Sequence, residues 1–215
     1  MGRLVNFGCS ITFGEGLKDC QNIGHAPSLN PSQFAWPVHL AKSLQKKPIN
    51  LGYSGISNKL ICQKLLNYQY ISNDTVVILW THFARTTFFT DTQQVINVQP
   101  TNKDNFKYYD TRSKRVNETF YRDMFFYNNQ NIENYKDINF SKLYLDSKGI
   151  KNYHFTWQQL PFNKQLTPSW NVVDLHYINL FEENNMFLDY ADDRSHPGIE
   201  TQKNISNIMY NIIKA

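Results

Sequence analysis

The segment Thr75–Trp80 restricts the fold more than any other part of the chain. It reads Thr-Val-Val-Ile-Leu-Trp, a continuous run rich in β-branched and apolar residues, and the turn-forming pair Asn73-Asp74 precedes it. A strand without polar alternation is buried on both faces, which is typical of a parallel sheet covered by helices. The sequence therefore predicts an α/β fold in which Thr75–Trp80 is the most strongly marked strand.

Shorter strand and helix signals alternate along the rest of the chain. Apolar runs bounded by turn residues predict further strands at 4–7, 48–51, 152–157 and 172–175. Helical spacing of apolar residues predicts helices at 36–44, 57–68, 138–147 and 198–213. Strands that alternate with helices form a mostly parallel sheet with both faces covered, and ligands bind beyond the carboxyl ends of its strands.

The chain has 215 residues, which is enough for one α/β domain with a full core and short for two. We therefore expect residues 1–215 to form a single domain. Within it, the stretch at about 90–137 is polar, rich in Asn and Tyr, and only partly periodic. We expect an insertion there, and two alternatives stay open: a lid or wall beside the substrate, or a solvated excursion of the chain.

Charge and composition argue against several classes of function. The net charge is +4, but Lys and Arg are scattered, whereas nucleic-acid binders gather them on one face, so no nucleic-acid partner is expected. The most apolar run is too short to span a bilayer and the first residues lack a signal peptide, so we expect a cytoplasmic protein without membrane contact. Three cysteines without metal-ligand spacing predict reduced thiols, and neither metal nor cofactor is expected. The oligomeric state stays open.

Two motifs at opposite ends of the chain carry the groups of a nucleophilic site. Gly8-Cys9-Ser10 follows the first predicted strand, which places the Ser10 hydroxyl at the carboxyl edge of the sheet. Asp193-Arg194-Ser195-His196 precedes the last helix, and its Asp can accept from the histidine Nδ1–H, which leaves Nε2 free for a serine proton. Each motif alone has a structural alternative: Ser10 as a helix N-cap, and Asp193 as the start of a turn.

Two further turns follow predicted strands and supply candidate donors. Gly55 allows close backbone approach and offers an N–H to a developing oxyanion, with a turn before a helix as the structural alternative. Thr81 and His82 follow the strongest strand, where a side-chain donor would complete an oxyanion hole. Cys9 is an alternative nucleophile, but alternation along an extended segment directs it inward if Ser10 faces the cleft.

In this order, the motifs resemble those of the SGNH, or GDSL-like, hydrolase family. Gly8-Cys9-Ser10-Ile11-Thr12 is similar to its first block, Tyr53-Ser54-Gly55-Ile56-Ser57-Asn58 to its second, and Asp193-Arg194-Ser195-His196 to its last. The resemblance implies Ser10 as nucleophile, Gly55 as oxyanion glycine, and His196 and Asp193 as the rest of a triad. It also implies a flavodoxin-like three-layer α/β/α sandwich, whose members hydrolyse esters, thioesters and acetyl groups on carbohydrates without a metal.

The chain departs from the family pattern in two places. Cys9 replaces the aspartate of the first block, which bears on local hydrogen bonding rather than on the nucleophile. In the third block the oxyanion asparagine falls at His82, whose neutral ring donates one hydrogen bond, with Thr81 as the alternative donor. Arg85 is close by in sequence, and it is expected either to bind an anionic group of the substrate or to form a surface salt bridge.

Together, the motifs and the resemblance predict a serine ester hydrolase that forms a covalent acyl-Ser10 intermediate on a small ester or an O-acetylated carbohydrate. Two alternatives stay open. An acyltransferase would use the same intermediate with a sugar hydroxyl as acceptor. A non-catalytic binding module would keep the fold but not the chemistry, as the altered third block permits.

Overall fold

The computed structural model describes residues 2–20, 30–92, 94–100, 111–158, 175–178 and 187–215. Its centre is a five-stranded parallel sheet in the order β2-β1-β3-β6-β7. The strands are β1 (Arg3–Gly8), β2 (Lys47–Asn50), β3 (Thr75–Trp80), β6 (Lys151–Thr156) and β7 (Leu175–Tyr177). The first four confirm the predicted strands, with ends shifted by one residue at most. Of the strand predicted at 172–175, only Leu175 lies in the described part of the chain, where it begins β7.

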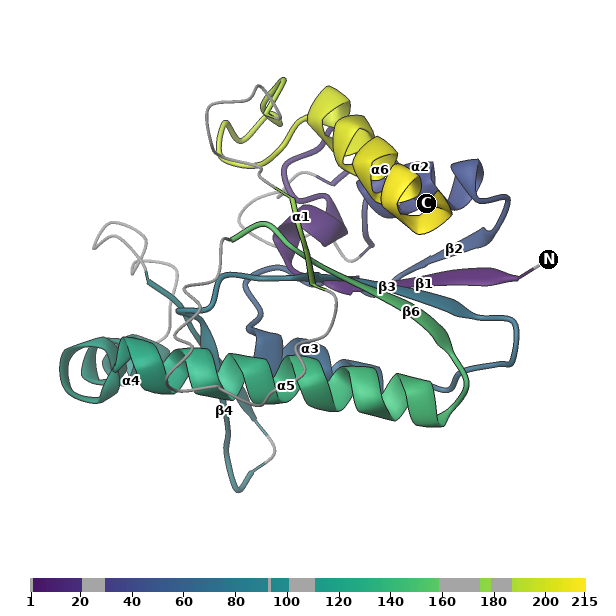
Figure 1. The fold of residues 1–215 in the computed structure, drawn as a ribbon. Coiled ribbons are helices and arrows are strands. Elements are labelled where there is room, and N and C mark those ends of the chain that lie inside the picture. The colour runs from purple at the N-terminus through teal and green to yellow at the C-terminus, as the bar shows by residue number, and fades with distance from the viewer. Residues whose placement is uncertain (1, 21–29, 93, 101–110, 159–174, 179–186) are drawn as a thin grey trace.

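Helices cover both faces of this sheet (Figure 1). α1 (Ser10–Phe13), α2 (Trp36–Ser43) and α6 (Ile199–Lys214) lie over one face, where α2 packs against α6. α3 (Asn58–Leu66) and α5 (Tyr127–Ser147) pack together over the opposite face. The predicted three-layer α/β/α arrangement around a mostly parallel sheet is therefore confirmed. No described helix combines the length and the hydropathy that a membrane crossing requires.

β3 forms the centre of the core, as its sequence predicts. All six of its residues are buried between the helical layers. At its last residue, the Trp80 indole N–H donates to His154 Nδ1 at 3.2 Å, and His154 Nε2 lies 3.0 Å from Asn152 Oδ1. Burial lowers the pKa of His154 to about 3, so this ring is a neutral, hydrogen-bonded part of the core.

The helix predicted at 138–147 is longer than predicted, because α5 begins at Tyr127. Its packing face explains the difference. The buried residues of its first half are amides and a phenol: Gln130, Asn131, Asn134 and Tyr135. A helix is recognised in a sequence by the spacing of apolar residues, and a face made of amides does not carry that signal.

The stretch at about 90–137 forms further regular structure in its described parts. β5 (Val95–Val98) pairs with β4 (Thr86–Phe89), which precedes it, as an antiparallel hairpin outside the main sheet. α4 (Thr111–Thr119) continues into a π-helical turn, η2 (Phe120–Met124). Ile96, Val98 and Phe120 form a small apolar cluster that joins the hairpin to these helices. These elements are absent from the sequence-based prediction. In α4, Val116 is the only apolar residue, so the helix shows no helical spacing of apolar residues.

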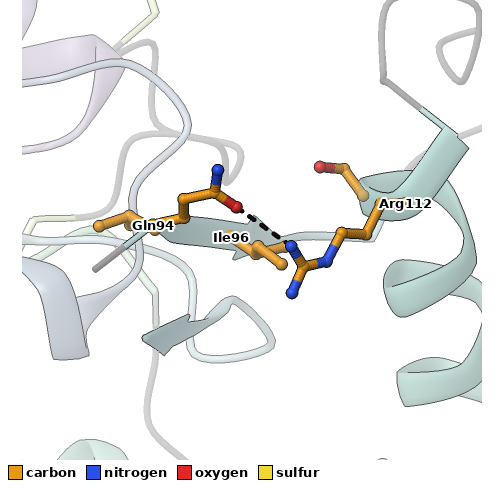
Figure 2. Close-up of a pocket in the computed structure, with 5 residues that line it drawn as sticks. Gln94, Ile96 and Arg112 are labelled. Atoms are coloured by element: carbon orange, nitrogen blue, oxygen red, sulfur yellow. Dashed lines mark hydrogen bonds between the residues drawn. The ribbon is translucent and has the colours of Figure 1, made fainter. Parts of the chain in front are cut away.

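A pocket opens between this hairpin and the start of α4 (Figure 2). It is lined by Gln94, Val95, Ile96, Arg112 and Ser113. Arg112 Nη1 donates to Gln94 Oε1 at 3.1 Å, so the guanidinium is engaged by the pocket wall itself. The hairpin projects away from the side of the sheet on which α1 lies (Figure 1). The pocket contains none of the predicted site residues.

Candidate active site

Ser10 follows the carboxyl end of β1, after a tight strand-to-helix turn that leaves no room for a larger residue at Gly8. A Cβ on Gly8 would overlap the Thr12 side chain and lie 2.9 Å from the Leu79 carbonyl oxygen. Ser10 is the first residue of α1 and is only 5% exposed. Its hydroxyl lies 4.0 Å from Cys9 Sγ, and Cys9 belongs to the hydrophobic core. Cys9 is therefore part of the core, and Ser10 is the more exposed of the two residues.

Asp193 and His196 form a hydrogen-bonded pair inside one tight turn. Asp193 Oδ2 lies 2.6 Å from His196 Nδ1, while Asp193 Oδ1 accepts from the backbone N–H groups of Ser195 (2.9 Å) and His196 (3.0 Å). Partial burial opposes ionisation of Asp193, but these hydrogen bonds outweigh it and hold the pKa of the carboxyl below its usual value. The ionised carboxylate therefore orients the imidazole with Nε2 directed away from it.

The turn that carries this pair lies against the loop that follows α1. Asp192 N–H donates to the Gly16 carbonyl at 3.1 Å, and a Cβ on Gly16 would lie 2.5 Å from the Asp193 carboxyl. Gln202 of α6 adds a second link, because its side chain donates to the Ile11 carbonyl at 3.1 Å. The structure thus brings the segment that contains α1 and the turn that contains Asp193 and His196 side by side.

Ser10 and His196 are not hydrogen-bonded to each other within the described residues. His196 Nε2 instead faces Glu15, whose Oε2 lies 3.6 Å away. Glu15 stands between Gly14 and Gly16, whose φ angles of 83° and 82° favour glycine. Sequence motifs do not single out Glu15, and its flanking glycines are the one local sign that its position is fixed.

Gly55 lies in a turn after β2, and hydrogen bonds join the residues before Gly55 to the segment around Ser10. Tyr53 N–H donates to the Gly8 carbonyl at 3.1 Å, and Asn50 Nδ2 donates to the Thr12 carbonyl at 2.7 Å. Gly55 has a φ of 71°, and no described residue accepts a hydrogen bond from its N–H. This N–H is therefore open to a ligand at the edge where Ser10 lies.

Thr81 is enclosed by polar partners where the chain leaves β3. Its N–H donates to Asn58 Oδ1 at 2.7 Å, its carbonyl accepts from Asn58 Nδ2 at 3.1 Å, and its hydroxyl accepts from Arg85 at 3.1 Å. Asn58 Nδ2 also donates to Asn134 Oδ1 at 2.6 Å, and Asn58, Asn134 and Thr81 are all buried. We call these three residues the buried amide network. It fixes the strand end and leaves Thr81 poorly placed to touch a substrate.

His82 is oriented by its own turn. Ala84 N–H donates to His82 Nδ1 at 3.1 Å, so Nδ1 is the acceptor and the proton of the neutral ring lies on Nε2. The ring centroid lies 5.7 Å from that of Trp157. Burial, and to a smaller degree the charge of Arg85, lower the pKa of His82, which favours the neutral ring at neutral pH. Of the two candidate donors after β3, His82 is therefore the one with an available N–H among the described residues.

In the described ranges, no three His, Cys, Asp or Glu side chains gather as ligands for an ion. Arg85 turns inward to the Thr81 hydroxyl, and no carboxylate of the described chain pairs with it. The salt-bridge alternative for Arg85 is therefore not seen in these parts of the structure.

Comparisons with known proteins support the fold. No family model and no curated protein matches the chain. Similar solved structures include a carbohydrate esterase whose active site displays divergent catalytic and non-catalytic binding functions (TM-score 0.54, 13% identity). They also include an acetyl xylan esterase from the rumen bacterium Butyrivibrio proteoclasticus (0.55, 12%) and a family two carbohydrate esterase from Clostridium thermocellum in complex with cellohexaose (0.54, 13%).

These matches cover 99% of this chain but only 63% to 64% of the other chains. The chain therefore spans less than two thirds of the length of the structures that it matches. At such low identity the likeness is one of fold, and it confirms the predicted SGNH-like α/β arrangement.

Proposed function

We propose that this chain, which has an SGNH-like hydrolase fold, is a serine ester hydrolase. Ser10 is the proposed nucleophile, His196 the base and Asp193 the carboxylate that orients it. One observation carries the proposal: the hydrogen-bonded Asp193–His196 pair is docked on the loop that follows the short helix headed by Ser10. Both groups lie at the edge of a parallel sheet where α/β proteins bind their ligands.

In the proposed reaction, Ser10 Oγ forms a bond to the acyl carbon while its proton passes to His196 Nε2. The Asp193 carboxylate stabilises the imidazolium that forms. Collapse of the tetrahedral intermediate breaks the bond to the alcohol, which leaves with the proton from Nε2. Water then attacks the acyl carbon of acyl-Ser10 while His196 Nε2 takes its proton. Collapse of this second tetrahedral intermediate releases the acid, and the proton from Nε2 returns to Ser10 Oγ. A productive complex requires a hydrogen bond between Ser10 Oγ and His196 Nε2, and catalytic hydrogen bonds often tighten only when a substrate binds.

The proposed oxyanion hole has three donors. Two are the backbone N–H groups of Ser10 and Gly55, and the third is Nε2–H of His82. The first N–H groups of a helix have no acceptor within the helix, which applies to Ser10, and the N–H of Gly55 is open among the described residues. The hydrogen bond from Ala84 supports the role of His82, because it leaves the ring proton on Nε2.

A small ester or an O-acetylated carbohydrate is the proposed substrate. Two similar structures support this class: one is of an acetyl xylan esterase and another is of an esterase in complex with cellohexaose. A non-catalytic binding module is the second candidate. It is favoured by the lack of a hydrogen bond between Ser10 and His196 among the described residues, where His196 Nε2 faces Glu15 instead. One similar structure is of a carbohydrate esterase whose active site displays non-catalytic as well as catalytic binding functions.

Labelling with a fluorophosphonate tests the proposal. An activated serine displaces fluoride from such a probe, and mass spectrometry of digested protein locates the phosphonylated residue. We expect the intact protein to be labelled on Ser10, Ser10→Ala to stay unlabelled, and Cys9→Ala to be labelled like the intact protein. Absence of labelling in a protein that circular dichroism shows to be folded would favour the binding module. Product analysis with glycerol present as acceptor separates hydrolysis from acyl transfer.

A further inference from the structure

We infer that Glu15 selects the alcohol part of the ester, favouring alcohols that carry hydroxyl groups next to the ester oxygen. The inference rests on the proposed function. In that reaction His196 Nε2 gives its proton to the departing alcohol oxygen, so the atoms around Nε2 surround the alcohol. Glu15 Oε2 lies 3.6 Å from Nε2, which places its carboxylate beside the position of the departing alcohol.

The backbone on both sides holds Glu15 in this position. The N–H groups of Gly14 and Glu15 both donate to the Ser10 carbonyl, at 2.8 and 3.1 Å. A Cβ on Gly14 would lie 2.6 Å from the Ser32 side chain, and one on Gly16 would lie 2.5 Å from the Asp193 carboxyl. The left-handed backbone and the lack of space for a side chain therefore require glycine on either side. Glu15 is fixed between the nucleophile segment and the turn of the base.

The Glu15 carboxylate has acceptor capacity to spare. Its ion-pair partner within the described chain is His196, and its side chain is 21% exposed. No described Lys or Arg pairs with it. An ionised carboxylate accepts hydrogen bonds and donates none. A ligand beside it must therefore bring donors.

An ester oxygen carries no hydrogen, so the donors must come from neighbouring groups of the alcohol. Hydroxyl groups on the adjacent carbons of a sugar or another polyol meet this requirement, whereas a plain alkyl chain does not. A hydroxyl that donates to a carboxylate forms a charge-assisted hydrogen bond, which is stronger than a neutral one. An alcohol that carries a phosphate is repelled by the same carboxylate. Glu15 thus favours neutral polyol esters over both alkyl esters and anionic esters.

A matched pair of esters tests this inference. Glyceryl monoacetate and propyl acetate share the acyl group and the three-carbon chain, and they differ in the two hydroxyl groups. We expect the intact protein to hydrolyse glyceryl monoacetate with the higher kcat/KM. In Glu15→Leu the ratio of the two kcat/KM values should fall about tenfold or more, as expected for the loss of a hydrogen bond to a charged group. Glu15→Gln keeps an acceptor oxygen and should give an intermediate ratio.

Glu133→Gln is the matched control, because it removes the same charge from an exposed pair with Lys136 on α5. Its ratio should equal that of the intact protein. An acetylated glycerol phosphate adds a second arm: Glu15→Gln should hydrolyse it better than the intact protein does.

Three results would overturn the inference. If Glu15→Leu lowers both kcat/KM values equally, Glu15 merely supports His196. If the ratio does not change, the alcohol does not contact Glu15. If the intact protein hydrolyses neither ester and also escapes the fluorophosphonate, the proposed function fails and the inference fails with it.

Discussion

The backbone N–H of Ala84 donates a hydrogen bond to Nδ1 of His82, at 3.1 Å, in the turn after β3. This bond directs the ring proton to Nε2, the donor that we propose for the oxyanion hole. We expect His82→Ala to lower kcat by about a hundredfold, with little change in KM, because such a donor acts mainly in the transition state. Steady-state kinetics with a short-chain acetyl ester measures both constants.

Two variants sharpen this prediction. His82→Asn places an amide donor at the same position and should keep most of the activity. Thr81→Val should change kcat far less than His82→Ala, because the Thr81 hydroxyl is turned to Arg85 inside the protein. Unchanged kcat in His82→Ala together with a large loss in Thr81→Val would reverse the assignment.

The pH dependence bears on the same residue. Burial and Arg85 lower the pKa of His82, so the ring loses its proton at a lower pH than an unperturbed histidine does. The acid limb of the kcat profile should therefore be the same in His82→Asn as in the intact protein, and a shift between the two profiles would show that His82 titrates there.

Ser10 and His196 are expected to act as one unit. Ser10→Ala and His196→Ala should each lower kcat by about a thousandfold or more, and the double variant should be little worse than either. Each single change removes the same proton transfer, so the second has little left to remove. Additive losses would mean that the two residues serve separate steps, and full activity in Ser10→Ala would exclude an acyl-Ser10 intermediate.

Local sequence signals predicted the parts of the structure that depend on neighbours in the chain. The buried run Thr75–Trp80 marks the central strand by itself. Asp193 and His196 lie within one turn, so their hydrogen bond follows from their spacing. The motifs at Ser10, Gly55 and Thr81–His82 come after successive predicted strands, so the sequence also orders these three along the sheet.

The remaining features depend on contacts between segments that are distant in sequence. Glu15 meets His196 only because the turn before α6 docks on the loop after α1. Asn58 and Asn134 meet only because α3 packs against α5. Asn134 and the other buried amides of α5 dilute the apolar periodicity that would have marked the start of that helix. The tautomer of His82 depends on one backbone N–H, which no residue pattern encodes.

The buried amide network should contribute measurably to stability. Asn134→Ala leaves Asn58 with an unpaired buried N–H, and it also removes the donor at 2.9 Å from the Phe83 carbonyl. Leaving such groups unsatisfied should lower the free energy of unfolding by about 1–3 kcal/mol. Chemical denaturation measures it. Asn139→Ala on the same helix is the control, because among the described residues the Asn139 side chain donates to the Tyr135 carbonyl one turn earlier, within the helix itself, and should matter less.

A double-mutant cycle tests whether the two amides act together. Asn58→Ala and Asn134→Ala should be less than additive, with a coupling free energy of about 0.5–3 kcal/mol, because each removes the shared hydrogen bond. Full additivity would show that the 2.6 Å bond between them contributes nothing on its own.

The ion pair between Arg3 and Asp74 should make the free energy of unfolding fall as the pH becomes acidic. Both oxygens of Asp74 accept from the Arg3 guanidinium, at 2.7 and 2.6 Å, and Asp74 Oδ2 also accepts from Ile71 N–H at 2.9 Å. Burial alone would raise the pKa of Asp74, but these hydrogen bonds outweigh it and lower the pKa below its usual value. A carboxyl with a lowered pKa binds fewer protons in the folded state than in the unfolded chain.

Its contribution to stability is therefore fully present above the unfolded pKa of about 3.9, and it is lost as the pH falls through the lower folded value. We expect the urea midpoint of the intact protein to fall over this range more steeply than that of Asp74→Asn, which has no carboxyl to protonate at this position. Arg3→Met keeps the carboxyl but removes its main partner, so its midpoint should also fall less steeply. Equal slopes in all three proteins would show that the Arg3–Asp74 pair does not set the acid sensitivity of the fold.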